Sequence, residues 1–362
     1  MLMKKEIKLN LATFDLVKGI ALIGIVLGHM FSHYDTARAP GLVVFSLPLF
    51  LLRTAINPMF LIASGFGFRP KPMGKMLKKT ASELLKPYGY VTLAVAILFP
   101  LVHFLFYRWW PGAVQEGMRY LLAFLLGVPK TGKTVLGISL YECSIMWFFL
   151  SLFWGLNLLN GILKLKREWT RLTAVAACAV LGYGLMLLDF NFFCIPQGLM
   201  AVGCCYTGYL LKQYKLYTGE KTHLWLYLAL AAATLWQAFF GDFNLAHGIF
   251  RYGLFDYIGA VCAGALLLIL GIHMSAWEWK GLDGLRKVGV YSYWILCIHS
   301  VELVCIPWYT LTQVLAEHQV LAFLVEATAK GLLYGAGCFV LKRISRQLYK
   351  RRIKRSGKQK LH

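Results

Sequence analysis

Long apolar segments recur along the chain and are separated by short polar stretches. Each is about 18 to 25 residues long with few charges, enough for a helix to cross a hydrocarbon core about 30 Å thick. Because a spanning segment must satisfy its own backbone groups, these segments are predicted to be helices. The pattern predicts an all-α polytopic membrane protein with spans at 14–34, 43–67, 87–107, 143–163, 172–189, 194–211, 222–240, 250–273, 288–307 and 320–341.

The basic residues follow the same division of the chain. If the amino-terminal segment lies inside and successive loops alternate between the two sides, the inner side receives 29 of the 38 Lys and Arg. They lie in the amino-terminal segment, 69–86, 164–171, 212–221, 280–287 and the tail from Lys342. Cytoplasmic loops of membrane proteins are enriched in Lys and Arg, so both termini are expected in the cytoplasm. The basic residues of these loops and the tail then account for the net charge of +22. No nucleic-acid partner is predicted, because the sequence has no nucleic-acid-binding motif or soluble basic domain.

Composition supports the membrane assignment and limits the chemistry. The chain is 59% hydrophobic and 15% charged, whereas soluble domains are nearer 45–50% and 25%. Most of the nine cysteines lie in apolar segments, and only Cys204 and Cys205 are close in sequence. Without a CxxC pair or ligand-like spacing, neither a disulfide framework nor a metal site is predicted.

The longest stretch between spans is 108–142, on the predicted outer side. Within it, VQEGMRYLLAFLLG (114–127) has the pattern of an amphipathic helix that lies at the membrane interface. The polar segment PKTGKT follows it and is expected to be a flexible loop. No separate soluble domain is expected in this stretch.

Ionisable residues interrupt the first span, FDLVKGIALIGIVLGHMFSHYD (14–35). Lys18 and His29 are eleven residues apart, which is three helical turns plus about 20°, so they share a face with a rise of roughly 16 Å between them. Asp15 is placed to pair with Lys18, and His33 lies one turn beyond His29. These groups either serve function, as is usual for ionisable residues in a membrane, or Lys18 snorkels to the interface and His29 caps a neighbouring carbonyl. The HxxxH spacing lacks a third ligand, so no metal is expected.

Four segments, in this order, resemble the acyltransferase-3 family of integral membrane acyltransferases. FDLVKGIALIGIVLGH resembles the first-helix signature, in which an acidic residue precedes Arg or Lys and then Gly, and a His follows after ten residues. NPMFLIASGFGFRPK (57–71), SIMWFFLSLFW (144–154) and VGVYSYWILCIHS (288–300) resemble later family segments. Position 18 is Lys where many members have Arg, which keeps the charge but loses bidentate geometry.

The resemblance implies an acyltransferase of the bacterial cytoplasmic membrane. Such enzymes move an acyl group, commonly acetyl, from cytoplasmic acyl-CoA to a hydroxyl or amine of an extracytoplasmic glycan or other envelope acceptor, for example in polysaccharide O-acetylation. His29 is then expected to be the general base, with an acyl-histidine intermediate as the alternative. Lys18 is expected to orient the acyl-CoA donor, and Asp15 to fix Lys18.

Further donor-side residues are expected at the cytoplasmic end of the second span. The hydroxyl of Ser64 either contacts the donor or, beside Gly65, belongs to a small-residue helix contact. Arg69 and Lys71 follow where the chain leaves the membrane. They either bind the donor phosphates or are ordinary positive-inside charges.

Acceptor-side residues are expected near the outer ends of several spans. Glu142 precedes the fourth span, and His247 and Arg251 are four residues apart at the eighth. They either form a polar acceptor pocket or are solvated helix ends. His33 is a further candidate for contact with the acceptor, or it has no role. His299 and Glu302, three apart in the ninth span, are placed to touch as structural glue or as a second proton-handling site.

A proton-coupled secondary transporter or glycan exporter is the alternative function, with His29, His299 and Glu302 as a proton relay. Transporters often have two related halves, and no such repeat is found in this sequence. We therefore divide the chain into a transmembrane acyltransferase domain (1–342) and a basic cytoplasmic tail (343–362). The motifs leave open the acceptor, the acyl length, O- or N-transfer and the oligomeric state.

Overall fold

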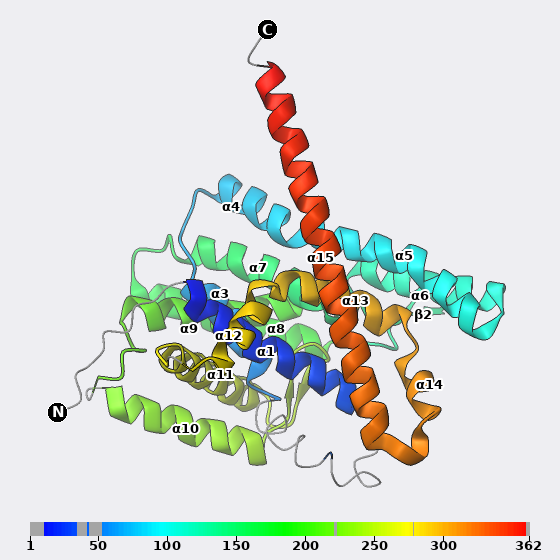
Figure 1. Ribbon diagram of the computed structural model, residues 1–362. Coiled ribbons are helices and arrows are strands. Elements are labelled where there is room, and N and C mark those ends of the chain that lie inside the picture. Colours follow the sequence, from blue (N-terminus) through cyan, green and yellow to red (C-terminus); the bar gives the residue numbers. More distant parts are fainter. Residues whose placement is uncertain (1–10, 35–41, 43–52, 221–222, 278, 360–362) are drawn as a thin grey trace.

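The protein is a helical bundle with two small hairpins (Figure 1). The computed structural model describes residues 11–34, 42, 53–220, 223–277 and 279–359. The helices are α1 (Leu11–Phe31), α3 (Ile56–Phe66), α4 (Met73–Thr80), α5 (Lys86–Tyr107), α6 (Trp110–Leu126), α7 (Trp147–Ile162), α8 (Glu168–Leu187), α9 (Ile195–Gln213), α10 (Leu224–Phe239), α11 (Leu254–Met274), α12 (Gly281–Val290), α13 (Ser292–Cys305), α14 (Trp308–Gln313) and α15 (Gln319–Gln359). The antiparallel hairpins are β1 (Thr134–Val135) with β2 (Ile138–Ser139) and β3 (Phe243–Asn244) with β4 (Ile249–Phe250).

Each predicted span coincides with a helix in its described part, so the all-α membrane class is confirmed. In the described chain, six helical stretches are long and apolar enough to cross a membrane, or seven if α12 and α13, bent by 71°, form one broken span. The second and seventh predicted spans correspond to the shorter apolar helices α3 and α10, and the second is described only from residue 53. The count of ten and the sidedness of the termini remain predictions.

Close backbone contacts hold α3 against α9. A Cβ at Gly65 would lie 1.8 Å from the carbonyl oxygen of Cys205, and one at Gly208 would lie 1.9 Å from that of Ile62. Only glycine permits such an approach, as at the small-residue contacts typical of membrane helices. The SGF segment therefore serves helix packing here.

The first helix is fixed in the same way. A Cβ at Gly19 would lie 2.0 Å from the carbonyl oxygen of Leu285, and one at Gly289 would lie 1.6 Å from that of Asp15. The amino-terminal half of α1 therefore rests directly on α12. This contact sets the rotation of α1, and with it the direction in which the His29 side chain points.

The segment 108–142 contains the expected helix as α6, which packs antiparallel along α5. The rings of Phe99 and Tyr120 are tilted, with centroids 4.9 Å apart, and the Tyr88 hydroxyl donates to the carbonyl of Phe124. The stretch PKTGKT leads into the β1–β2 hairpin. In this arrangement the Tyr141 hydroxyl, from the loop after β2, donates to the carboxylate of Glu116 on α6.

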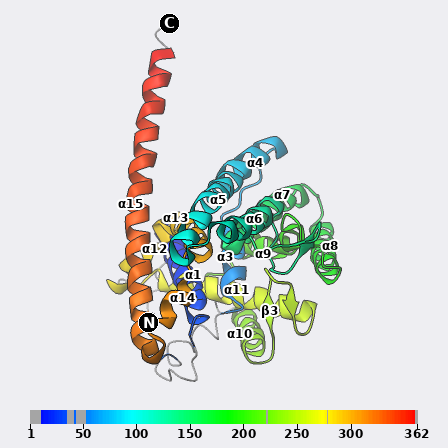
Figure 2. The ribbon, with the colours of Figure 1, turned by 90° about the vertical axis from the view of Figure 1, so that its right-hand side faces the viewer.

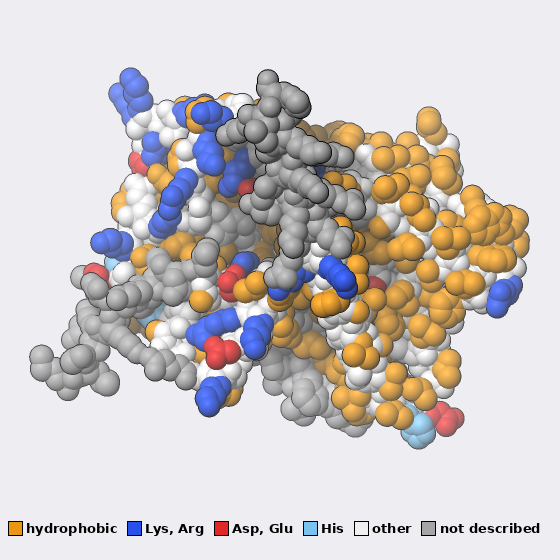
Figure 3. Space-filling model, turned by 45° about the horizontal axis from the view of Figure 1, so that its top comes forward, with side chains coloured by type: hydrophobic (Ala, Val, Ile, Leu, Met, Phe, Trp, Pro, Cys, Tyr) orange, Lys and Arg blue, Asp and Glu red, His pale blue; other side chains and the backbone are white. Residues whose placement is uncertain are grey.

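The last long helix, α15, stands at one edge of the bundle, and its carboxyl end extends beyond the other helices (Figures 1 and 2). It continues through residue 342 without a break, while the domain boundary there remains a prediction. One face of the molecule has a broad area of hydrophobic side chains on one side and Lys and Arg gathered on the other (Figure 3). This separation agrees with basic loops beside an apolar membrane-embedded region.

Candidate functional site

His29 lies where two cavities meet. The first, of about 290 Å³, is lined from α1, α3 and α7 and includes Phe60 and Phe148. The second, of about 250 Å³, includes Glu142 and His247. Both cavities are lined by His29, and its side chain is exposed to them although it belongs to a membrane-spanning helix. A titratable group is therefore accessible to small molecules at this point.

A second histidine lies directly behind the first. The rings of His29 and His299 are 5.4 Å apart, centroid to centroid, and meet edge to face. His299 on α13 is fully buried, and its Nδ1 lies 2.6 Å from Oε1 of Glu302. Its Nε2 has no hydrogen-bond partner among the described residues. The contact predicted between His299 and Glu302 is confirmed, and it adjoins His29.

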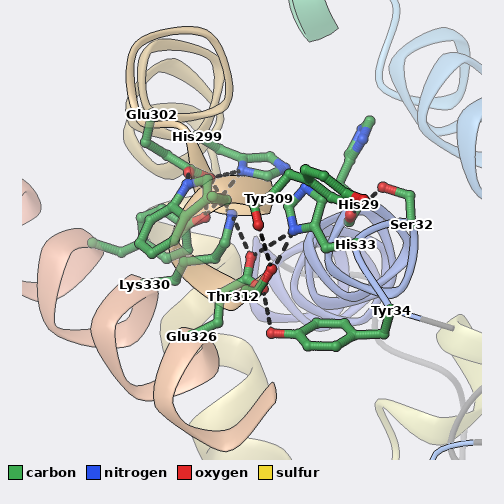
Figure 4. A network of polar contacts seen from close by, with 12 residues as sticks. His29, Ser32, His33, Tyr34, His299, Glu302, Tyr309, Thr312, Glu326 and Lys330 are labelled. Carbon is green, nitrogen blue, oxygen red and sulfur yellow. Dashed lines mark hydrogen bonds and ion pairs between the residues drawn. The ribbon is translucent and has the colours of Figure 1, made fainter. Parts of the chain in front are cut away.

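Four ionisable residues, His299, Glu302, Glu326 and Lys330, form a buried charge cluster between α13 and α15 (Figure 4). The Lys330 ammonium donates to both oxygens of Glu302, at 2.8 and 3.0 Å, and lies 3.4 Å from Glu326. Burying a charge is costly unless it is paired, and here each carboxylate contacts the ammonium. Trp308 also donates its indole N–H to Glu302.

The cluster extends to the end of α1 through Glu326. The Nδ1 atom of His33 lies 3.1 Å from one Glu326 oxygen, and the Tyr34 hydroxyl donates to the other at 2.8 Å (Figure 4). His33, placed on the acceptor side by sequence, thus contacts the buried charge cluster and lines a different cavity from His29.

Sequence inspection missed Glu326 and Lys330, which lie in the predicted tenth span. Two opposite charges four residues apart in an apolar helix are placed to pair, and intramembrane charges usually face a bundle interior. That spacing was the available signal. Their link to Glu302, 24 and 28 positions earlier, depends on how α15 crosses α13.

Glu142 and His247 are joined across 105 residues of chain. The Nε2 atom of His247 lies 3.1 Å from Oε2 of Glu142, and the backbone N–H of His247 donates to the side chain of Asn244. The β3–β4 hairpin thereby presents His247 to the second cavity, opposite Glu142. The structure brings these two acceptor-side candidates together with His29.

A third cavity, of about 280 Å³, lies next to the second, because Tyr120 and Val304 line both. Its wall includes Glu116, which accepts hydrogen bonds from Tyr141 at 2.5 Å and from Arg119 at 2.9 Å. Burial and the neighbouring Glu116 raise the pKa of Tyr141, so its hydroxyl stays protonated and remains a donor. The cavity therefore combines aromatic faces with hydrogen-bonding groups.

Lys18 and Asp15 pair as expected, with Nζ 2.7 Å from Oδ1. Neither residue lines the cavities at His29. Arg251 donates to the carbonyl of Phe240 at 3.3 Å and also lies outside them. The roles proposed for these residues remain predictions.

The remaining donor-side candidates lie apart from His29. The Ser64 hydroxyl donates to the carbonyl of Phe60, one turn back in α3, at 2.9 Å. Arg69 and Lys71 have exposed side chains, and the backbone of Lys71 is held by the buried Asn160 through hydrogen bonds of 2.9 and 3.0 Å. Asn160 thus fixes the path of the chain that presents both cations.

No group of three or more His, Cys, Asp or Glu in the described part of the chain is arranged to hold a metal ion. The residues around His29 are instead acid–base groups: His299 contacts its ring, and Glu142 and His247 line the second cavity with it. Such an arrangement is able to move protons to or from a molecule bound beside His29.

Comparison with known proteins agrees with the motifs. No curated protein and no solved structure matches the chain. The acyltransferase domain of the acyltransferase-3 family matches residues 11–355, nearly the whole chain, and includes α1, the cavities and the buried charge cluster. This protein therefore belongs to the acyltransferase-3 family and is a membrane acyltransferase.

Proposed function

We propose that this enzyme transfers an acyl group, such as acetyl, from cytoplasmic acyl-CoA to a hydroxyl of an extracytoplasmic glycan or another envelope acceptor. The observation that supports this most directly is the position of His29. Its imidazole lines two neighbouring cavities and contacts the ring of the buried His299. A base in such a place is accessible to substrate and held in position.

His29 acts as the general base in this proposal. Its imidazole takes the proton from the acceptor hydroxyl while the oxygen attacks the thioester carbonyl and forms the new C–O bond. The C–S bond then breaks, and the CoA thiolate receives the proton from the imidazolium. In the alternative route, a His29 nitrogen attacks the thioester carbonyl, the C–S bond breaks, and CoA leaves as the thiol with the imidazole proton. The acyl-histidine then passes its acyl group to the acceptor oxygen, and the imidazole recovers a proton from the acceptor hydroxyl.

Amide groups are available for the developing oxyanion. Asn57 and Asn244 line both the first and the second cavity, as His29 does. Fixed donors aimed at a developing oxyanion usually provide a large part of acyl-transfer catalysis. We assign them this role.

The second and third cavities suit a sugar-like acceptor. The paired Glu142 and His247 offer hydrogen bonds to hydroxyl groups, and Tyr120, Tyr141 and Trp308 offer aromatic faces. A few placed polar groups in an otherwise apolar pocket are typical of small-molecule sites. The same lining residues also allow the acceptor group to be an amine instead of a hydroxyl.

The donor is proposed to approach from the Lys18 end of α1. Lys18 is roughly 16 Å from His29 along the helix, comparable to the pantetheine arm of CoA. Asp15 holds Lys18 in place. With the exposed Arg69 and Lys71, and the hydroxyl of Ser64, this end offers contacts for an anionic nucleotide. Arg251 remains an acceptor-side candidate.

The test is acyl transfer by purified protein in detergent with radiolabelled acetyl-CoA and a glycan acceptor. His29→Ala is expected to lower the transfer rate by about 10²–10⁴-fold, the usual contribution of general acid–base catalysis. The matched control is His273→Ala, on α11 and away from these cavities, which is expected to retain the wild-type rate. Both variants should elute and melt like the wild type. A His29→Ala protein that transfers normally would refute the base assignment.

The buried charge cluster favours one second candidate, a proton-coupled transporter, because intramembrane ionisable chains often relay protons. Transfer in detergent needs no proton gradient, whereas coupled transport does. Wild-type protein that fails to bind acetyl-CoA in detergent, yet moves protons in vesicles, would replace the transferase proposal with this one.

A further inference from the structure

A separate groove lies on another face of α1, between α1, the α12–α13 bend and α15. It measures about 570 Å³ and shares no lining residue with the cavities at His29. Leu22, Val26 and Met30 line it from α1 at four-residue intervals, so one stripe of the helix forms a wall. Its size falls within the range of small-molecule sites.

The opposite wall is opened by two glycines of α15. A Cβ placed on Gly331 or Gly335 would meet nothing within 4 Å, and both residues line the groove. In contrast, a Cβ on Gly337 would lie 2.6 Å from the Ile298 side chain, where α15 packs on α13. The helix is thus tightly packed on one side and leaves an open trough on the other.

The trough is long enough for a lipid chain. Its lining on α15 runs from Ala327 to Lys342, a rise of roughly 22 Å at 1.5 Å per residue. One leaflet of the hydrocarbon core is about half of the ~30 Å bilayer core. Since α15 stands at the edge of the bundle (Figure 2), a chain from the bilayer has access to this wall.

Two lysines gather at one end of the groove, around Tyr291. The Lys342 ammonium donates to the Tyr291 hydroxyl at 2.8 Å, and Lys287 lies one helical turn before Tyr291 with its side chain exposed. No carboxylate within the described residues pairs with either ammonium. Lys330 also lines the groove, but its ammonium is already bound by Glu302 and Glu326.

We propose that this groove binds one anionic phospholipid, with an acyl chain along Gly331 and Gly335 and the headgroup phosphate between Lys287 and Lys342. An apolar trough of this length that ends in two lysines without a carboxylate partner among the described residues matches the two halves of such a lipid. Each basic residue near a membrane surface favours anionic lipid. A zwitterionic lipid would bring its own cation close to the lysines.

The lipid would also complete the surroundings of the buried charge cluster. Lys330 and Tyr334 line the groove, and the Tyr334 hydroxyl lies 3.0 Å from both Nδ1 of His299 and Oε1 of Glu302. An acyl chain packed on these two side chains excludes water from the side of the cluster that faces the bilayer. Pairing between buried charges is stronger when water is excluded.

Native mass spectrometry of detergent-purified protein tests the proposal, with phosphatidylglycerol and phosphatidylcholine of identical acyl chains as probes. The wild type is expected to retain one phosphatidylglycerol and to bind phosphatidylcholine on the order of tenfold more weakly. Lys287→Gln with Lys342→Gln should reduce phosphatidylglycerol binding to the phosphatidylcholine level. Gly335→Leu should reduce the binding of both lipids by filling the trough.

The matched control is Gly89→Leu on α5, where a Cβ also meets nothing within 4 Å and which lies outside this groove. It should bind both lipids like the wild type. Equal affinity of the wild type for the two lipids, or undiminished binding by Gly335→Leu, would overturn the proposal, as would displacement of the lipid by inorganic phosphate. If Gly335→Leu does not fold, the double lysine variant decides. Binding needs no acyl transfer, so this result is independent of the proposed function.

Discussion

Lys330 is the residue on which the buried charge cluster most depends. It is 1% exposed, yet it bears a charge in a helix that the sequence predicts to span the membrane. Its ammonium contacts Glu302 and Glu326 and lies 4.7 Å from the Trp308 ring centroid. One cation thereby stabilises two buried carboxylates, and the nearer carboxylate orients His299 beside His29.

Replacing Lys330 with Met should destabilise the protein by about 3–5 kcal/mol, because two buried carboxylates would lose their common counter-ion. The same substitution at Lys133 is the control, since its partner Asp189 is 62% exposed and such pairs contribute about 0–1 kcal/mol. Thermal unfolding of purified protein measures both. Equal melting temperatures for the two variants would mean that the buried charge cluster is not a stabilising unit.

At the scale of the element, close contacts between glycines and the backbone of neighbouring helices position the helices that bear the site. Gly65 and Gly208 allow α3 to touch α9, and Gly19 and Gly289 allow α1 to touch α12. The second of these contacts fixes α1, from which Lys18 and His29 project. A change at either contact has to move a whole helix, because the opposing atom is backbone.

Gly65→Ala should therefore destabilise the bundle by about 1–3 kcal/mol, the usual cost of overpacking. Gly89→Ala, in the open surroundings of α5, should instead stabilise it by up to about 1 kcal/mol, since Ala is the better helix former. Unfolding temperatures in detergent compare the two. A Gly65→Ala protein that melts above the wild type would show that α3 and α9 are not in contact.

At the scale of the whole molecule, the remaining question is which loops share a side of the membrane. The loop charges predict that the carboxyl terminus and residues 164–171 are cytoplasmic and that the 130–133 loop is outside. The six or seven apolar stretches found among the described helices do not by themselves fix this order.

Reporter fusions test this topology. Alkaline phosphatase inserted at 130–133 should be active, because the enzyme works only outside the cytoplasm. The same insertion at 164–167 should be inactive, and green fluorescent protein fused after residue 362 should fluoresce. Activity at 164–167 would reverse the assignment of sides and would place Lys18 away from cytoplasmic acyl-CoA.

The sequence alone determined the membrane class, the helix positions and the family, because apolar length, helical periodicity and short motifs are local properties. It also placed Lys18 and His29 on one face and paired His299 with Glu302, since those relations lie within single helices. Only the tertiary structure joined Glu142 to His247, placed His299 against His29, and brought Lys330 to Glu302. These contacts join residues on different elements and depend on how those elements pack against one another, which no local sequence pattern predicts.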